Sequence, residues 1–477
     1  MKKNRTSSLF RLIAVALLLV LTVGTMTSCA FSWNWAGGII PNASDGKKNP
    51  STASGTDTFA DVNGFAVDAE GHLILHLGDG TELELNISGD AGIRGVIPSD
   101  VYNTEIKVDT SGTTDLSYAA SKALLSSVSV WCSYERRVAV DPFSSWFFGY
   151  GSNQQSTEEY HTAGSGVIFK LDKQKGDAYI ITNFHVVYDS QSTAEDGISQ
   201  KITVNLFGSE ADDMSIPAEF IGGSLYYDIA VLKVSGSTLL QHSAAEAVTF
   251  GNSDAVTAGQ VAMAVGNPEA GGISVTSGIV SVPSEYINMT GADNRTAVSF
   301  RVIRVDTAVN SGNSGGGLFN AAGDLIGIVN AKVSDSSVEN IGYAIPTSVV
   351  RAIAENILYY CDGKDCKRVQ RGMLGISVQR SGSHAVVDPE TGLVSIEEMI
   401  SVAEVTEGGL ADGVLMVGDV ICAVTIGEKT VQVTRQYHVI DTMLDARVGS
   451  TVVFSILRGG ESMDVSFTLD EDSLTAY

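Results

Sequence analysis

One serine in this chain has the surroundings that a nucleophile requires. Ser314 lies in the glycine-rich stretch at residues 312–316, between two apolar, strand-like runs. Glycines on both sides leave room for an incoming carbonyl group, and they let the backbone turn amide N–H groups toward a developing oxyanion. Glycine- and serine-rich stretches are also typical of ordinary turns. Ser314 is therefore a candidate nucleophile only if the chain also supplies a base and an orienting acid.

His185 and Asp228 are the candidates for these two roles. His185 follows a run of β-forming residues at 178–181, and Asp228 directly precedes the apolar run at 229–232. Each could also be structural, since a lone histidine is often buried and hydrogen-bonded and an aspartate often ends a strand. A serine hydroxyl needs a base to take its proton, and the base needs an acid that fixes its tautomer. The chain order His185, Asp228, Ser314 is the order of chymotrypsin-type proteases.

The sequence around these residues resembles the HtrA family of chymotrypsin-fold serine proteases with a C-terminal PDZ domain. The resemblance extends over roughly residues 113–470, and its motifs occur in order and at suitable spacing. The matching motifs are GSGVI at 164–168, TNFHVV at 182–187, DIAVLK at 228–233, GNP at 266–268, SVTSGIVS at 274–281, DTAVN at 306–310, GNSGG at 312–316 and IGYAIP at 341–346. The resemblance implies a mostly β chain whose protease domain is a double β-barrel, at residues 160–240 and 245–346, with the active site between the barrels.

The resemblance also implies a role for each residue of the site. Ser314 would be the nucleophile, His185 the general base and then acid, and Asp228 the residue that orients the base. The amides of Gly312 and Ser314 would form the oxyanion hole, and Asn313 between them would shape the turn. No metal and no cofactor is expected for this chemistry.

Two positions near the serine depart from the family pattern. Ser311 stands where the family usually has proline, and Gly317 replaces the proline that follows the double glycine. Both residues restore backbone freedom. The sequence therefore leaves open whether the oxyanion loop is ordered at rest or is set in place on activation.

Three residues are expected to line the S1 pocket, which receives the side chain before the cleaved bond. Ala308, six residues before the serine, would lie at its base, and Ile328 and Asn330 would complete it. A preference for Lys or Arg would require an acid at the position of Ala308. We therefore predict cleavage after small or medium-sized apolar residues.

The composition limits what the chain can be. Its 477 residues suffice for about three domains, and 44% hydrophobic residues exclude wholesale disorder. The formal net charge of −25 argues against nucleic acid as a partner, because no basic surface is available to displace phosphate counterions.

The N-terminus reads as a targeting segment. Basic residues at 2–5 precede an apolar run at 12–23, which is too short to cross a bilayer and is typical of a signal peptide. The small residues before Cys29 resemble a bacterial lipobox, which would make Cys29 the lipidated N-terminus of the mature chain. Met26 departs from the usual leucine, so plain secretion or an uncleaved signal anchor stays open. All three alternatives place the protein outside the cytoplasm. We expect it at the bacterial cell membrane or the cell surface.

Composition shifts divide the chain into seven expected segments. The segments are a lipoprotein-type signal peptide (1–28), a flexible tether (29–57), a small β module with a hairpin (58–97), a linker (98–112), the protease domain (113–357), the PDZ domain (358–470) and a tail (471–477).

The aromatic-rich loop at 141–160 lies within the expected protease domain. By resemblance, it would contribute to a homotrimer contact, and packing inside one chain is the alternative.

The PDZ-like region has its own expected site. By resemblance, the amides of Met373, Leu374, Gly375 and Ile376 would hold the carboxylate of a peptide C-terminus while the peptide adds a strand to the sheet. Residues 433–446 would supply the helix that walls this groove. Cys361 and Cys366 nearby could form a disulfide in an oxidising compartment or remain two thiols.

These features together predict an ATP-independent, surface-anchored serine endopeptidase of HtrA type. It would degrade misfolded or damaged extracytoplasmic proteins as part of protein quality control in the stress response. The alternative is a chaperone or binding protein with a PDZ domain and an inactive or latent protease domain. Casein digestion by the wild type and by Ser314→Ala would separate the two.

Overall fold

The computed structural model describes residues 116–138, 156–209, 214–331 and 341–477, and the backbone of four strands between residues 62 and 95. The chain divides into two compact units, 1–110 and 111–477. The expected signal peptide, lipidation site, tether and linker, and residues 141–155 of the aromatic loop, lie outside the described residues. No helix within the described ranges is long and apolar enough to cross a bilayer.

The first unit contains a four-stranded antiparallel sheet. The expected hairpin is present as the second and third strands, in which Leu73 faces Leu85 and Leu75 faces Leu83. An isolated hairpin is only marginally stable. Here two further strands flank the hairpin, one on each side. The strands, in sheet order, are β1 (Val62–Val67), β2 (Leu73–Leu77), β3 (Glu82–Asn86) and β4 (Arg94–Gly95).

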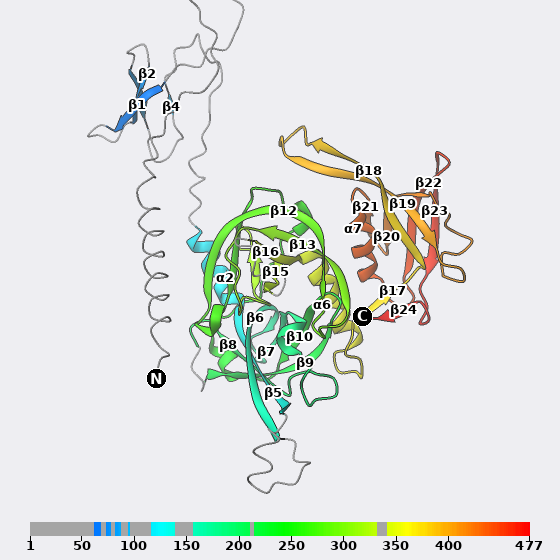
Figure 1. Cartoon of the computed structure of the whole chain (residues 1–477), viewed down its shortest axis with the longest axis horizontal. Helices are drawn as coiled ribbons and strands as arrows, with labels where there is room; N and C mark the ends of the chain where they lie inside the picture. Colours follow the sequence, from blue (N-terminus) through cyan, green and yellow to red (C-terminus); the bar gives the residue numbers. More distant parts are fainter. Residues whose placement is uncertain are drawn as a thin grey trace, which may run out of the picture. The chain divides into compact units, whose positions relative to one another are not determined.

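The second unit begins with a short helix and a closed six-stranded barrel (Figure 1). Apolar side chains at alternate positions, such as Val128, Val130 and Cys132, point into the barrel. The first barrel strand runs from Ser127 and pairs along its whole length with the second. The elements are α2 (Ser117–Ser126), β5 (Ser127–Val138), β6 (Ser156–Asp172), β7 (Asp177–Thr182), α4 (Phe184–Val187), β8 (Lys201–Leu206), β9 (Ile216–Ser224), β10 (Ile229–Val234) and α5 (Thr238–His242).

A second closed barrel of six strands follows. Val167 and Ile181 of the first barrel share one buried cluster with Met263, Val265 and Phe300 of the second, so the two barrels are packed as one body. Its elements are η3 (Ser253–Ala255), β11 (Val261–Gly266), η4 (Pro268–Ala270), β12 (Ser274–Thr290), β13 (Ala297–Val305), β14 (Gly317–Phe319), β15 (Leu325–Val329) and β16 (Gly342–Pro346). The prediction of a mostly β fold with a double-barrel protease domain is confirmed.

Helix α6 (Thr347–Tyr360) leads out of the second barrel. Val349, Val350, Ile353 and Ile357 are buried at helical spacing. The helix packs against β10 of one barrel and β15 of the other. It therefore ties the two barrels together before the chain enters the C-terminal domain.

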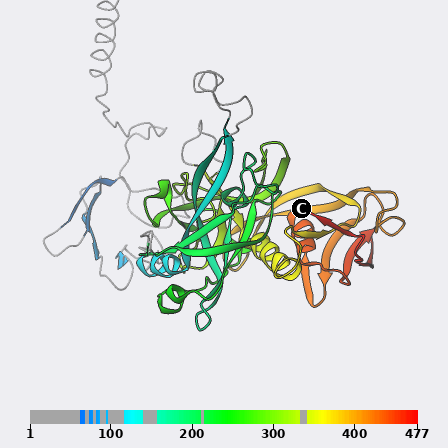
Figure 2. The same cartoon turned by 90° about the horizontal axis from the view of Figure 1, so that it is seen from below.

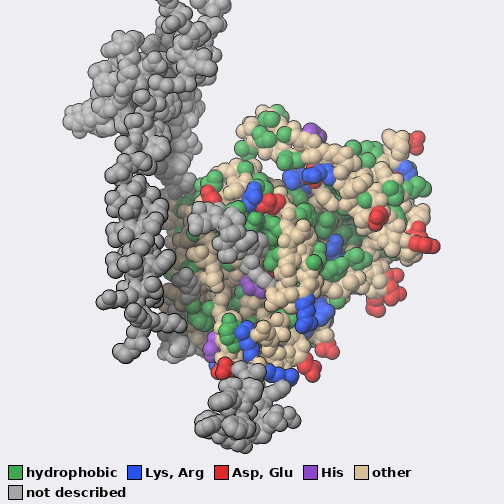
Figure 3. Space-filling model, in the orientation of Figure 1, with side chains coloured by type: hydrophobic (Ala, Val, Ile, Leu, Met, Phe, Trp, Pro, Cys, Tyr) green, Lys and Arg blue, Asp and Glu red, His purple; other side chains and the backbone are tan. Residues whose placement is uncertain are grey.

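The C-terminal domain is a sheet of five strands in the order β18-β19-β20-β22-β23, with β21 on β20 and a short helix, α7, beside the sheet. Strand β18 is at the open edge of this sheet. The tip of the β18–β19 hairpin exposes apolar side chains (Figure 3), among them Val387, Leu393 and Val394. The elements are β17 (Gln370–Gly372), β18 (Ile376–Val387), β19 (Val394–Val405), β20 (Val420–Ile426), β21 (Lys429–Gln432), α7 (Gln436–Thr442), η6 (Met443–Asp445), β22 (Thr451–Arg458) and β23 (Glu461–Thr468).

The segment expected as a tail, 471–477, contains a short strand. Strand β24 (Leu474–Ala476) pairs with β17, and the N–H group of Tyr477 donates to the carbonyl of Val369. The C-terminus consequently lies at the junction between the protease barrels and the C-terminal domain (Figure 2).

Candidate active site

His185 and Asp228 are held together by two hydrogen bonds. The ring nitrogen Nδ1 of His185 is 2.6 Å from Oδ2 of Asp228, and the backbone N–H of His185 donates to Oδ1 at 2.9 Å. His185 lies in the single-turn helix α4, directly after β7. Since both carboxylate oxygens bind the same residue, the imidazole ring is fixed with Nδ1 toward the acid and Nε2 directed away from it.

Asp228 adopts a backbone conformation that locks the corner between the strands. Its φ of 54° lies in the left-handed region, which aspartate tolerates better than most residues. Its carbonyl accepts hydrogen bonds from the Asn183 side chain at 2.9 Å and from the Phe184 backbone at 3.2 Å. The turn before β10 is thereby fixed to the turn after β7, which is where the acid must meet the histidine.

Asn330, at the end of β15, supplies a third donor to the carboxylate. Its Nδ2 donates to Asp228 Oδ2 at 2.8 Å, and the residue is 1% exposed. The sequence predicts Asn330 in the S1 pocket, but the structure directs its amide to the buried acid. The second barrel thus helps to hold a carboxylate that belongs to the first. A polar residue directly after the wholly apolar strand β15 was the available signal for such a role.

The nucleophile loop is shaped by glycines. Gly312 and Gly315 have φ values of 94° and 83°, which side-chain-bearing residues rarely adopt. A Cβ on Gly315 would also collide with the Ser165 carbonyl and the Thr182 hydroxyl. Ser314 between them is 6% exposed. The loop therefore reaches its conformation only with glycine at these two positions.

Ser165 connects this loop to the first barrel. Its hydroxyl donates to the carbonyl of Gly312 at 2.7 Å and accepts from the N–H of Asn267 at 2.8 Å. Its own N–H donates to the carbonyl of Ser314 at 2.8 Å. The sequence shows Ser165 only as part of a matching motif, and nothing in the sequence indicates that its side chain contacts the nucleophile loop.

Two amides of the loop point to no acceptor within the described residues. The N–H groups of Asn313, Gly315 and Gly316 donate to the carbonyls of Asn310, Val329 and Asn313. By contrast, no intramolecular hydrogen bond from the N–H groups of Gly312 and Ser314 is found there. Buried amides are nearly always paired, so two amides without an intramolecular acceptor stand out in this loop. They are the two N–H groups that the sequence predicts for the oxyanion hole.

Ser314 and His185 are not yet hydrogen-bonded to each other. Among the described residues, no hydrogen bond links the hydroxyl of Ser314 to the imidazole of His185. Catalytic hydrogen bonds are often long or misaligned before substrate binds. Asp228 and His185 are therefore hydrogen-bonded to each other, whereas Ser314 and His185 are not.

The other two residues expected in the S1 pocket differ in exposure. Ala308 is exposed, and its carbonyl accepts a hydrogen bond from Thr276 at 2.9 Å. Ile328 is fully buried in the apolar cluster between the barrels. Of the three expected pocket residues, only Ala308 is exposed.

The predicted carboxylate loop precedes the edge strand β18. The N–H of Met373 donates to the carbonyl of Ser473, so this amide is occupied. No acceptor for the N–H groups of Leu374 and Gly375 occurs in the described part of the chain. Gln436 of α7 donates from Nε2 to the carbonyl of Val378 at 3.0 Å, which bridges the helix and the edge strand.

Comparisons relate the chain to known proteins. A family model described as a trypsin-like peptidase domain matches residues 164–328. The chain is 32% identical over 336 residues to the "Serine protease Do-like HtrA" of Bacillus subtilis, covering 69% of this chain and 68% of that protein. It is 30% identical to the "Periplasmic pH-dependent serine endoprotease DegQ" of Escherichia coli, covering 68% and 63%. A solved structure of an "HtrA-type protease AlgW with tripeptide" is 28% identical, with a TM-score of 0.47 and coverage of 76% and 97%.

Proposed function

The chain belongs to the HtrA family of serine proteases, and we propose that Ser314, His185 and Asp228 are the catalytic triad of this serine endopeptidase. The observation that carries the proposal is the double hydrogen bond from His185 to the carboxylate of Asp228. It fixes the tautomer in which Nε2 of His185 is free to accept a proton.

The proposed reaction uses these atoms in turn. As Ser314 Oγ attacks the peptide carbonyl carbon, its proton moves to His185 Nε2 and the carbonyl oxygen becomes an oxyanion. The amides of Gly312 and Ser314 stabilise that oxyanion. His185 then gives the proton to the leaving amine as the C–N bond breaks, and a water molecule hydrolyses the acyl-enzyme by the same steps.

Casein digestion tests this proposal against the chaperone alternative. We expect the wild type to degrade casein and Ser314→Ala to leave it intact while remaining folded. If neither protein cleaves casein and both suppress aggregation of an unfolded protein, the chaperone function is favoured instead. Ser129→Ala is a matched control, because Ser129 faces Ser165 across the barrel strands and its hydroxyl has no hydrogen-bond partner.

The proposed substrates are misfolded or damaged extracytoplasmic proteins. The relatives include a protease described as periplasmic, and the signal-peptide pattern with Cys29 supports anchoring to the membrane through lipid. The exposed, uncharged Ala308 supports cleavage after small or medium-sized apolar residues. A peptide-library digest in which Lys or Arg precedes the cleaved bond would contradict this specificity.

The C-terminal domain is proposed to bind peptide C-termini as a PDZ domain. The open edge of β18 and the unpaired amides of Leu374 and Gly375 support this role. A bound peptide would displace the hydrogen bond between Gln436 and Val378. Homotrimer formation through the aromatic loop is proposed on the family resemblance alone, and sedimentation analysis of the full chain would test it.

A further inference from the structure

Two cysteines lie at the junction between the protease and C-terminal domains. Cys361 immediately follows helix α6, and Cys366 lies five residues further on, before strand β17. Both are thiols in the structure, with their sulfur atoms 2.8 Å apart. A disulfide bond has a length of about 2.05 Å, so a movement of less than about 1 Å joins them.

The surroundings of this pair favour a disulfide over a metal site. Besides each other, the two sulfur atoms contact the carbonyl of Arg368, at 3.5 and 3.1 Å, and Nε2 of Gln370 donates to Cys366 Sγ at 3.7 Å. A structural zinc site requires four ligands, mostly cysteine and histidine. No group of three or more potential metal ligands occurs in the described part of the chain.

The loop that carries the pair is fixed to the barrel that holds Asp228. The carboxylate of Asp362 accepts from the Tyr179 hydroxyl at 2.6 Å and is 3.0 Å from Lys233 Nζ. The N–H of Gly223 donates to the carbonyl of Lys367 at 3.0 Å. These contacts hold both ends of the loop in which the two sulfur atoms lie 2.8 Å apart.

We propose that Cys361 and Cys366 form an intramolecular disulfide that cross-links the segment joining the protease domain to the C-terminal domain. The oxidant is a low-molecular-weight disulfide of the extracytoplasmic space. Cys366 is the more exposed sulfur, since Cys361 is 1% exposed. The bridge removes conformational freedom from the unfolded chain and from this segment.

The exchange proceeds in two balanced steps. The thiolate of Cys366 attacks the external disulfide, which forms a mixed disulfide and releases one thiol. The sulfur of Cys361 then attacks Cys366 Sγ and releases the second thiol. Two protein thiols are thereby oxidised by two electrons, and the external disulfide is reduced to two thiols. Burial raises the pKa of the Cys361 thiol, which is consistent with Cys361 acting second.

Oxidation of the full-length protein tests the proposal directly. The protein is incubated with oxidised glutathione, unfolded, treated with N-ethylmaleimide and digested for mass spectrometry. We expect residues 361 and 366 to be unmodified, joined and about two mass units lighter, for the two hydrogen atoms lost. Alkylation of both cysteines after oxidation would overturn the proposal, as would a bridge from either one to a second chain.

Two variants make the test specific. In Cys361→Ser the reaction should stop at the mixed disulfide of glutathione with Cys366. Cys422→Ser is the matched control, because it removes another partly exposed thiol and should leave the bridge intact. The melting temperature of the wild type should rise on oxidation and that of Cys361→Ser should not. Equal melting temperatures for the oxidised and reduced wild type would contradict the cross-linking role.

Discussion

Two aspartates of this protein, the buried Asp228 and the partly buried Asp441, are held in different ways. Asp228 accepts hydrogen bonds from the backbone and ring of His185 and from the side chain of Asn330. Asp441, on α7 of the C-terminal domain, is paired with Arg301 at 3.0 Å, but its Oδ2 has no hydrogen bond of good geometry. The first carboxylate has a full set of donors, whereas the second is held by one ion pair.

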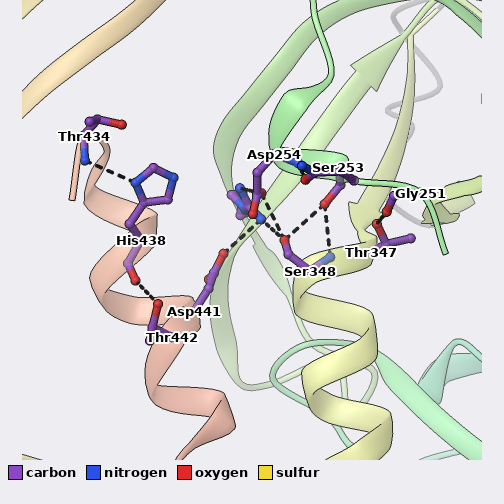
Figure 4. Close-up of polar contacts among 11 residues, drawn as sticks. Gly251, Ser253, Asp254, Thr347, Ser348, Thr434, His438, Asp441 and Thr442 are labelled. Carbon is purple, nitrogen blue, oxygen red and sulfur yellow. Dashed lines mark hydrogen bonds and ion pairs between the residues drawn. The ribbon is translucent and has the colours of Figure 1, made fainter. Parts of the chain in front are cut away.

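The surroundings of Asp441 form the contact between the second barrel and the C-terminal domain (Figure 4). Arg301 of β13, whose side chain is 2% exposed, also pairs with Asp254 at 2.8 Å and lies over the ring of Tyr437. Ser348, at the start of α6, donates to Asp254 at 3.1 Å. The cluster around Arg301 therefore links β13, η3 and α6 of the protease domain to α7, the helix expected to wall the peptide groove.

The difference between the two sites concerns charge. Burial raises the pKa of Asp441 to about 6. Among the charged groups facing it, Arg301 and Arg371 lower the pKa while Asp254 and Asp445 raise it. The contact around Asp441 is thus sensitive to mild acid, whereas three hydrogen bonds fix the position of the Asp228 carboxylate.

The largest effect is expected from Asp228→Asn. An asparagine can present its NH₂ group to His185 and favour the wrong tautomer, so kcat should fall by about 10⁴-fold. Steady-state cleavage of a peptide substrate measures this loss. Asp441→Asn should retain activity within a few-fold, and equal losses in the two variants would remove the distinction between the sites.

A smaller loss is expected from Asn330→Ala. Without this donor, one oxygen of the buried Asp228 carboxylate keeps only His185 as a partner, which costs about 1–2 kcal/mol or roughly tenfold in kcat. KM should change little, since Asn330 contacts the acid. A large rise in KM at constant kcat would instead assign Asn330 to the substrate pocket.

Ser165→Ala tests the support of the nucleophile loop. The change removes the hydrogen bonds to the Gly312 carbonyl and from the Asn267 amide, and we expect kcat to fall by about tenfold. Ser129→Ala, the neighbouring serine without a hydrogen-bond partner, serves as the control and should be close to wild type. Indistinguishable rates for Ser165→Ala and Ser129→Ala would show that the loop does not depend on this contact.

The smallest effect concerns the pH dependence of stability. Because the pKa of Asp441 is raised to about 6 from its ordinary value of 3.8, the folded protein binds the proton more tightly than the unfolded chain. The stability that protonation of Asp441 gives to the folded protein is fully present below the unfolded pKa, and it is lost as pH rises through about 6. The melting temperature of the wild type relative to Asp441→Asn should therefore rise by about a few degrees between pH 7 and pH 5. A constant difference would contradict the assignment.

The sequence predicts the barrels and the three residues of the proposed triad because their motifs are local and their order is distinctive. The contacts of Ser165, Asn330 and Arg301 could not be predicted, since each depends on which polar atom of a distant strand it meets after the barrels close. The sequence does not predict β24, because residues 474–476 show no distinctive alternation of apolar and polar residues. They form a strand only by pairing with β17.

Labelling with a fluorophosphonate tests the central claim most directly, since the probe reacts only with a serine activated by its base. The full-length protein is labelled with and without a C-terminal peptide, and the adduct is located by mass spectrometry. We predict an adduct on Ser314 that increases with the peptide, and none on Ser314 in His185→Ala. An adduct on a different serine, or equal labelling of Ser314 in the wild type and in His185→Ala, would contradict the proposed triad.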